Sequence, residues 1–252
     1  MQAHFLTDVG QVRSHNEDSG GIFYNTAGQM LGIVADGMGG HQGGEIASQL
    51  ATDYIKEKWE ASEVFKSPNL LESWLTETVL EANKKVYKES KEKENLEGMG
   101  TTVVIAVCTD EFITIAHIGD SRCYIYKNQE FKQITEDHSL VNELLRSGQI
   151  SVSDAEFHPR KNVLVRALGT EESVNSEIHT MEWEHENKLL LCSDGLSNKV
   201  TDQELAEFLA RQEELEKTGQ QLIDLANERG GEDNISLAII HHDATPRAGE
   251  DG

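Results

Sequence analysis

The chain has 252 residues, enough to build one large hydrophobic core. Lys and Arg total 22 against 45 Asp and Glu, and the resulting formal charge of −23 argues against a nucleic-acid binder or a protein held on an anionic membrane surface. Hydrophobic residues make up 37% of the chain, so a packed interior is expected rather than a disordered chain.

Strands and helices are predicted in blocks along the chain. From Glu45 to about Lys91 the apolar residues recur at intervals of three and four, which predicts two antiparallel helices separated at Ser67-Pro68-Asn69. Two further helices are expected over Thr201–Leu209 and Glu216–Glu228. Runs of apolar and β-branched residues predict strands over Leu31–Ala35, Thr101–Cys108, Phe112–Ile118, Arg122–Tyr126, Phe131–Ile134, Lys188–Ser193 and Asn234–Ile240. The four between 101 and 134 are expected to form one antiparallel meander.

This block order favours an α+β fold of antiparallel layers over a doubly wound parallel sheet. We expect a single domain over residues 1–242, because the chain has no Pro- or Gly-rich linker and no internal repeat. The segment of about 137–169, inserted between strands, is expected to form a mobile flap. The polar segment 243–252 is expected to be a disordered tail.

The cysteines and the N-terminal residues indicate a cytoplasmic protein. Cys108, Cys123 and Cys192 lie in apolar runs without paired spacing, so we expect small buried side chains in a reducing compartment rather than disulfides or a zinc site. The first residues lack the pattern of a signal peptide, and no apolar run approaches the ~20 residues of a membrane span.

Aspartates stand at the ends of several predicted strands. Asp36, Asp120 and Asp194 each follow an apolar run beside a glycine, Asp233 precedes the last strand, and Asp18 lies near the N-terminus. One Asp-Gly pair is usually only a turn, but several such carboxylates are costly to bury unless they are paired or bind metal. An oxygen-only ligand set favours Mg²⁺ or Mn²⁺ over Zn²⁺.

A glycine-rich segment, Asp36 to Gly44, follows a predicted strand and opens a helix. That context also fits a dinucleotide-binding protein, but Gln42 stands where a G-x-G-x-x-G pattern starting at Gly37 requires glycine. Asp36 would in addition repel a pyrophosphate unless a cation lay between them. The acidic strand ends and the glycine loop together predict metal-assisted chemistry on phosphate.

Other phosphate chemistries lack their motifs. The chain has no G-x-x-x-x-G-K-[ST] run, no cysteine with an arginine six positions on, and no D-x-D pair to supply an aspartyl nucleophile. A metal-activated water remains, because divalent ions lower the pKa of bound water. Arg13 suits the phosphoryl oxygens through its planar guanidinium; a surface ion pair with Glu17 is the equally supported alternative.

The chain resembles the PP2C-type (PPM) protein serine/threonine phosphatases, and most of all the compact bacterial members. The resemblance runs from about Phe5 to Ile240 and is carried by Arg13-Ser14-His15-Asn16-Glu17-Asp18, Val34-Ala35-Asp36-Gly37-Met38-Gly39-Gly40-His41, Gly100-Thr101-Thr102, Gly119-Asp120-Ser121-Arg122, Ser193-Asp194-Gly195 and Asp233-Asn234. It implies a four-layer α-β-β-α sandwich with two central antiparallel sheets and a binuclear Mn²⁺/Mg²⁺ site.

The resemblance also implies roles for individual residues. The implied metal ligands are Asp18, Asp36, Gly37, Asp120, Asp194 and Asp233. Asp36 would bridge both ions and, with the phosphate-binding Arg13, form the catalytic pair. Asp120 would hold a third, weaker ion together with Asp194. Met38 stands where eukaryotic members carry a histidine proposed as general acid, so that role stays open between His41, metal-bound water and bulk solvent; His41 can equally be a plain helix-start residue.

The implied activity is hydrolysis of phosphoserine and phosphothreonine in proteins by attack of a metal-bridged hydroxide. The implied partners are phosphoproteins and a cognate Ser/Thr protein kinase, and we expect a monomer. A metal- or phosphopeptide-binding module without activity is the alternative. The complete set of Arg13, Asp36, Asp194 and Asp233 argues against that alternative.

Overall fold

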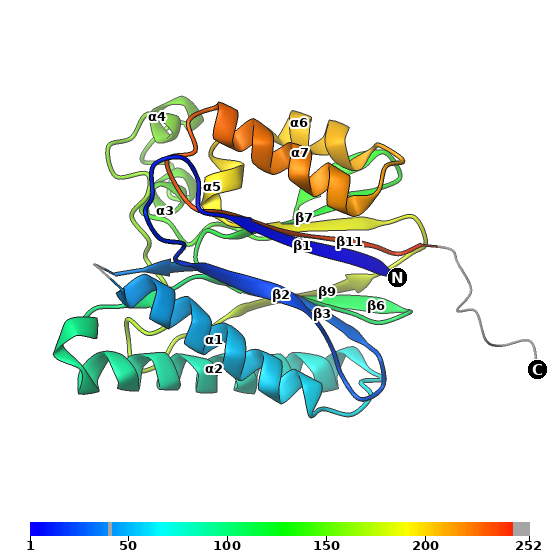
Figure 1. The fold of residues 1–252 in the computed structure, drawn as a ribbon, viewed down its shortest axis with the longest axis horizontal. Coiled ribbons are helices and arrows are strands. Elements are labelled where there is room, and N and C mark those ends of the chain that lie inside the picture. Colours follow the sequence, from blue (N-terminus) through cyan, green and yellow to red (C-terminus); the bar gives the residue numbers. More distant parts are fainter. Residues whose placement is uncertain (40–41, 244–252) are drawn as a thin grey trace, which may run out of the picture.

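A computed structural model describes residues 1–39 and 42–243. Over these residues the chain forms two antiparallel sheets stacked face to face, with helices on the outer face of each (Figure 1). This is the predicted α+β sandwich of four layers, and the fold class is confirmed. His41 lies outside the described residues, as does nearly all of the predicted tail.

The first sheet has the strand order β1-β11-β10-β7-β8 and the second the order β2-β3-β5-β6-β9, with the short β4 paired to β3. The strands of the first sheet are β1 Gln2–Asp8, β7 Arg122–Lys127, β8 Glu130–Gln133, β10 Lys188–Cys192 and β11 Ile235–His241. Those of the second are β2 Asp18–Tyr24, β3 Met30–Met38, β4 Gly100–Thr101, β5 Val103–Cys108, β6 Phe112–Ile118 and β9 Glu177–Glu182.

Long helices cover the second sheet and shorter ones the first (Figure 1). The helices α1 Gly43–Glu60 and α2 Pro68–Glu92 pack on the second sheet, followed by the 3₁₀ turn Glu94–Leu96. On the first sheet lie α5 Asp194–Ser197, α6 Asp202–Leu209 and α7 Leu215–Glu228. The inserted segment carries α3 Leu140–Arg146 and α4 Val152–Glu156 at one end of the sandwich.

The central strands are apolar throughout because both of their faces are covered. In β3, Leu31 and Ile33 pack toward α1 and α2, while Met30 and Val34 pack into the layer between the sheets. Strand β10 divides in the same way: alternate side chains enter the layer between the sheets or the layer under α6 and α7. Alternation along a strand therefore places every apolar residue in one of three hydrophobic layers.

The predicted meander over 101–134 is wrong. Strands β5 and β6 pair in the second sheet, whereas β7 and β8 pair in the first, and the chain crosses between the sheets at Gly119–Ser121. Gly119 has a φ of +105°, a conformation that side chains with a Cβ rarely adopt, and this allows the abrupt change of direction. The short apolar runs alone carried no sign of the crossing.

Two smaller differences concern the strands. Thr102 interrupts the strand predicted over Thr101–Cys108, because its hydroxyl, in place of a backbone carbonyl, accepts the hydrogen bond of the Asp36 amide on β3. The strands β1, β2 and β9 were not predicted. The helices of 43–92, α6 and α7 confirm the predictions within a few residues.

The cysteines and helices agree with the composition. Cys108, Cys123 and Cys192 are all buried and free, as expected. Burial raises the pKa of the Cys108 and Cys192 thiols to about 12, so both stay protonated and unreactive. No helix in the described part of the chain is long and apolar enough to cross a membrane.

The neighbours Leu70 and Leu71 on α2 test the position of this helix. Leu71 is fully buried in the layer under the second sheet, whereas Leu70 is 62% exposed. We expect Leu71→Ala to lower the free energy of unfolding by about 2–5 kcal/mol through the cavity it leaves. Leu70→Ala should change it by less than about 0.5 kcal/mol in the same urea titration. Similar losses for both variants would contradict this packing.

Candidate metal and phosphate site

Antiparallel pairing gathers the predicted aspartates at one end of the sandwich. Asp18 begins β2 and Asp36 lies near the end of β3, and the two are direct partners in the ladder. Asp194 follows β10, Asp233 precedes β11, and these two strands are also antiparallel neighbours. Asp120 lies in the crossing between the sheets. Because one strand of an antiparallel pair ends where its neighbour begins, residues far apart in sequence meet at this edge.

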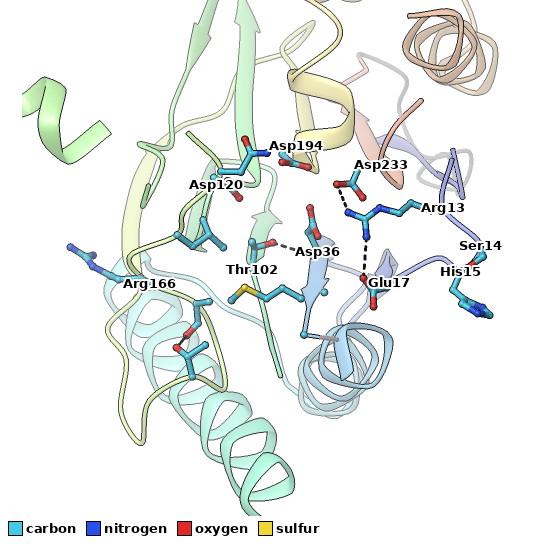
Figure 2. A pocket seen from close by; sticks show the side chains of 17 residues that line it. Arg13, Ser14, His15, Glu17, Asp36, Thr102, Asp120, Arg166, Asp194 and Asp233 are labelled. Atoms are coloured by element: carbon cyan, nitrogen blue, oxygen red, sulfur yellow. Dashed lines mark hydrogen bonds and ion pairs between the residues drawn. The ribbon is translucent and has the colours of Figure 1, made fainter. Parts of the chain in front are cut away.

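The gathered residues line a pocket of about 740 Å³ (Figure 2). Its lining includes Arg13, Asp36, Gly37, Asp120, Asp194 and Asp233. Asp18 lies just behind it, where its Oδ2 accepts a hydrogen bond of 2.8 Å from Ser193 Oγ. The structure thus brings together every predicted site residue that it describes.

Two threonines fix the main chain of Asp36. The Thr101 hydroxyl and the Thr102 amide donate to the Asp36 carbonyl at 2.9 and 2.8 Å. The Asp36 amide in turn donates to Thr102 Oγ1 at 3.0 Å. With its peptide groups held in this way, the Asp36 side chain faces the pocket beside Asp194 (Figure 2). This hydrogen-bonding role of the Gly-Thr-Thr sequence was not predicted.

Gly37 occupies a position with no room for a side chain. A Cβ here would overlap the carbonyl oxygen of Gly44 at the start of α1 and that of Glu17. The Gly37 amide donates to the Glu17 carbonyl at 3.1 Å, so the peptide is held where β3 meets the loop before β2. The absence of a side chain lets the backbone reach the pocket.

Asn234 holds the loop that carries Arg13. Its Nδ2 donates to the carbonyl oxygens of Val9 and His15, both at 2.9 Å, and its Oδ1 accepts from the Glu17 amide at 2.7 Å. One buried side chain therefore bonds this loop at both ends and in its last turn. The sequence showed Asn234 beside Asp233 but not the partners that give it this role.

Arg13 projects from this loop toward the aspartates (Figure 2). One guanidinium nitrogen donates to Asp233 Oδ2 at 2.9 Å, and the other lies 3.7 Å from Glu17 Oε2. The ion pair with Glu17 considered from the sequence is therefore present, together with a shorter one to a predicted metal ligand. His15 also lines the pocket but points away from the aspartates.

The aspartates share a low-dielectric environment that opposes their ionisation. Burial raises the pKa of Asp18 to about 7, and the charges of Asp194 and Asp233 add to this effect. Burial likewise raises the pKa of Asp120 to about 7, with a further contribution from Asp194. For Asp36, burial and the charge of Asp18 raise the pKa well above its usual range. Such a group needs a compensating positive charge to stay ionised at neutral pH.

The donor atoms of the pocket fit a hard divalent cation. Asp18 Oδ1 and Asp194 Oδ1 are buried, yet neither has a hydrogen-bond partner in the described part of the chain. Carboxylate and carbonyl oxygens are the ligands preferred by Mg²⁺ and Mn²⁺. A bound cation would satisfy both orphaned oxygens and remove the repulsion between the carboxylates.

A second group of possible ligands lies outside this pocket. Ligand atoms of His117, His138 and Glu177 lie within 4.8 Å of one another. The Arg166 guanidinium already lies 3.2 Å from Glu177 Oε1 and 3.4 Å from His138 Nε2, and a positive charge there disfavours a cation. These contacts join both ends of the inserted segment to β6 and β9 instead. Arg166 lines the pocket, but its guanidinium points away from the aspartates (Figure 2).

The chain belongs to the protein phosphatase 2C family, whose model matches residues 10–229. It is 44% identical over 247 residues to the serine/threonine phosphatase stp of Listeria monocytogenes serotype 4b, with 98% of each chain covered. The serine/threonine phosphatase Stp1 from Staphylococcus aureus superposes with a TM-score of 0.90 at 38% identity, covering 94% of this chain and 93% of that one.

A structure of the catalytic domain of PstP in complex with 2 manganese ions is also similar, with a TM-score of 0.82 and 32% identity over 94% of this chain and 96% of that domain. The chain is thus a metal-dependent protein serine/threonine phosphatase, as the sequence predicted. Its substrates are phosphoproteins.

Removing one carboxyl from the pocket should stabilise the metal-free protein more as the pH rises. The unfolded chain ionises Asp120 near pH 4, but the folded chain does so only near pH 7. The stabilising effect of the protonated group is therefore complete below about pH 4 and is lost as the pH rises toward about 7. In EDTA, we expect the Tm of Asp120→Asn minus that of wild type to grow over this range.

The variant and the wild type must be compared at each pH, because other groups also make stability depend on pH. Burial lowers the pKa of His117 to about 4, so this group destabilises the folded protein as the pH falls. Added Mn²⁺ should raise the Tm of wild type more than that of the variant. A difference in Tm that does not change with pH would contradict this account of the pocket.

Proposed function

We propose that the pocket at Arg13, Asp36 and Asp194 is where this phosphatase hydrolyses phosphoserine and phosphothreonine. The observation that carries the proposal is the meeting of an arginine with aspartates from four separate chain segments in one pocket. The orphaned carboxylate oxygens beside it support divalent metal as the cofactor.

The proposed ligands are the side chains of Asp18, Asp36, Asp120, Asp194 and Asp233 and the carbonyl oxygen of Gly37. Asp36, the ladder partner of Asp18, would contact both of two ions. Asp194 and Asp233 would hold one of them and the Gly37 carbonyl the other. Asp18 would act through water, and Asp120 with Asp194 would hold a weaker third ion. Mn²⁺ and Mg²⁺ both suit such oxygen ligands.

When bound, divalent ions lower the pKa of water and offset the negative charge on the phosphoryl oxygens. The planar guanidinium of Arg13 binds non-bridging oxygens of the phosphoryl group. Its contacts with Asp233 and Glu17 keep it at the pocket and limit the conformations it must give up on binding substrate. Asn234 acts through the loop as a positioning residue.

Water is the proposed nucleophile, attacking phosphorus directly. Of the described hydroxyls that line the pocket, Thr102 Oγ1 is held by the Asp36 amide and Ser121 Oγ, and Thr170 Oγ1 donates to the Ala167 carbonyl. Ser14 lies on the loop away from the aspartates. The ester bond breaks as the new P–O bond forms, and the departing oxygen takes a proton. Met38 has none to give, so the donor is His41 or water.

The wider setting is also part of the proposal. We place the catalytic domain at residues 1–242, with the inserted segment 137–169 as its flap, and expect a cytoplasmic monomer. The lack of paired spacing among the three cysteines supports a reducing compartment. A Ser/Thr protein kinase is the proposed partner enzyme, because it forms the phosphate ester that is hydrolysed in this pocket.

Substitutions in the pocket separate metal binding from phosphate binding. Asp36→Asn should lower kcat for p-nitrophenyl phosphate at least ~100-fold, as should chelation, because the charge that holds the ions is lost. Arg13→Ala should lower kcat/KM about 10- to 100-fold, mainly through KM, by removing charged hydrogen bonds. Arg211→Ala, whose guanidinium bonds Gln221 far from the pocket, is the control. Full activity in EDTA or in Asp36→Asn would refute the site.

Rapid acid quench distinguishes direct attack from a covalent intermediate. During a single turnover it should trap no phosphorylated protein, while one oxygen from H₂¹⁸O in the released phosphate would show that water attacks phosphorus and not the carbon of the ester. A denaturation-stable phosphoenzyme formed at the rate of turnover would overturn direct attack and leave the metal site standing.

A further inference from the structure

The helix α3 has an apolar face that its neighbours cover only in part. Its sequence is Leu-Val-Asn-Glu-Leu-Leu-Arg, yet none of these residues, all of which the structure describes, is fully buried. Val141 and Leu145 are four residues apart and therefore lie on the same face. Both line a second hollow of about 940 Å³.

This hollow has apolar residues on both sides. From α4 come Val152, which is 78% exposed, and Ala155. From the connection between α5 and α6 comes Val200. The hollow is thus a groove between the inserted segment and the α5–α6 region; we call it the α3 groove.

The α3 groove is continuous with the catalytic pocket. Asp120, Asn162 and Asp194 line both. A polypeptide whose phosphorylated side chain lies between Arg13 and the aspartates must leave the pocket on either side of that residue. The shared residues make the α3 groove, which Val141 and Leu145 line, the continuation of the pocket on one side.

Five of the nine charged side chains that line the α3 groove are paired. Of the others, Asp120 and Asp194 belong to the catalytic pocket, and Lys161 and Asp202 form no ion pair among the described residues. Arg122 binds Asp137 at 2.7 Å, and Arg146 NH1 lies 3.4 Å from Glu136 Oε2. Lys199 forms an ion pair with Glu232 outside the groove. Paired charges offer little to a charged side chain. Contact with the apolar residues on the two sides of the groove can therefore distinguish one ligand from another.

We propose that the α3 groove binds the polypeptide segment that flanks the phosphorylated residue and selects substrates with an apolar side chain at one flanking position. The phosphatase therefore reads sequence beside the phosphate as well as the phosphate itself. This inference rests on the proposed function of the adjoining pocket.

The test uses phosphothreonine peptides of Gly and Ser in which one leucine is moved along both flanks. For wild-type enzyme with Mn²⁺, one position should raise kcat/KM about tenfold over the leucine-free peptide. The double variant Val141→Ser/Leu145→Ser should abolish this preference and leave turnover of p-nitrophenyl phosphate unchanged. Phe157→Ser, which alters an 84%-exposed apolar residue on the same insertion outside both hollows, should retain it.

A flat leucine scan with active wild-type enzyme would overturn the inference, and so would a preference that survives in the double variant. Loss of p-nitrophenyl phosphate turnover in the double variant would also overturn it, because the effect would then act through the metal centre. A dimer that sedimentation detects and that the double variant dissociates would also overturn the inference, because a second copy of the chain would then cover the face. Failure of the catalytic assignment is recognised separately, by undiminished turnover in Asp36→Asn.

Discussion

Repulsion between carboxylates crowded into one half-buried pocket is the constraint on which this structure depends. Charges held a few ångströms apart away from bulk water repel strongly, and burial alone already raises their pKa values. Hydrogen bonds hold the carboxylates in place despite this repulsion. Thr101 and Thr102 fix the backbone of Asp36, and Asn234 fixes the loop before Asp18. A site assembled in this way is arranged in advance for cations and presents them to an anionic ester.

The overall acidity and the pocket are separate matters. The net charge of −23 would repel a phosphoprotein if the surface met it uniformly. In the proposed site, divalent ions and Arg13 would make the local potential positive, so an acidic protein could bind phosphate there. The remaining acids lie mainly on exposed helices and loops, where they favour solubility and contribute little to the chemistry.

The sequence predicted what depends on local pattern. Apolar spacing located α1 and α2, and aspartates beside glycine at strand ends indicated the pocket. What it could not predict depends on distant contacts. Strand β2 contains Gly20 and Gly21, residues unfavourable in strands, yet a side chain at Gly20 would strike Phe5 of the other sheet. Asn234 donates a hydrogen bond to the carbonyl of His15, 219 residues away. The crossing at Gly119–Ser121 places the two halves of the predicted meander in different sheets.

The division of the aspartates between the sheets has a consequence for assembly. Asp18 and Asp36 belong to one sheet, Asp194 and Asp233 to strand ends of the other, and Asp120 to the segment that joins them. The proposed ligand set is divided in this way, so neither sheet alone carries all of it. An ion held by that set would add its binding energy to the stacking of the two layers. On this proposal the site is complete only when the sandwich is complete, and a half-assembled chain in the cell would remove no phosphate.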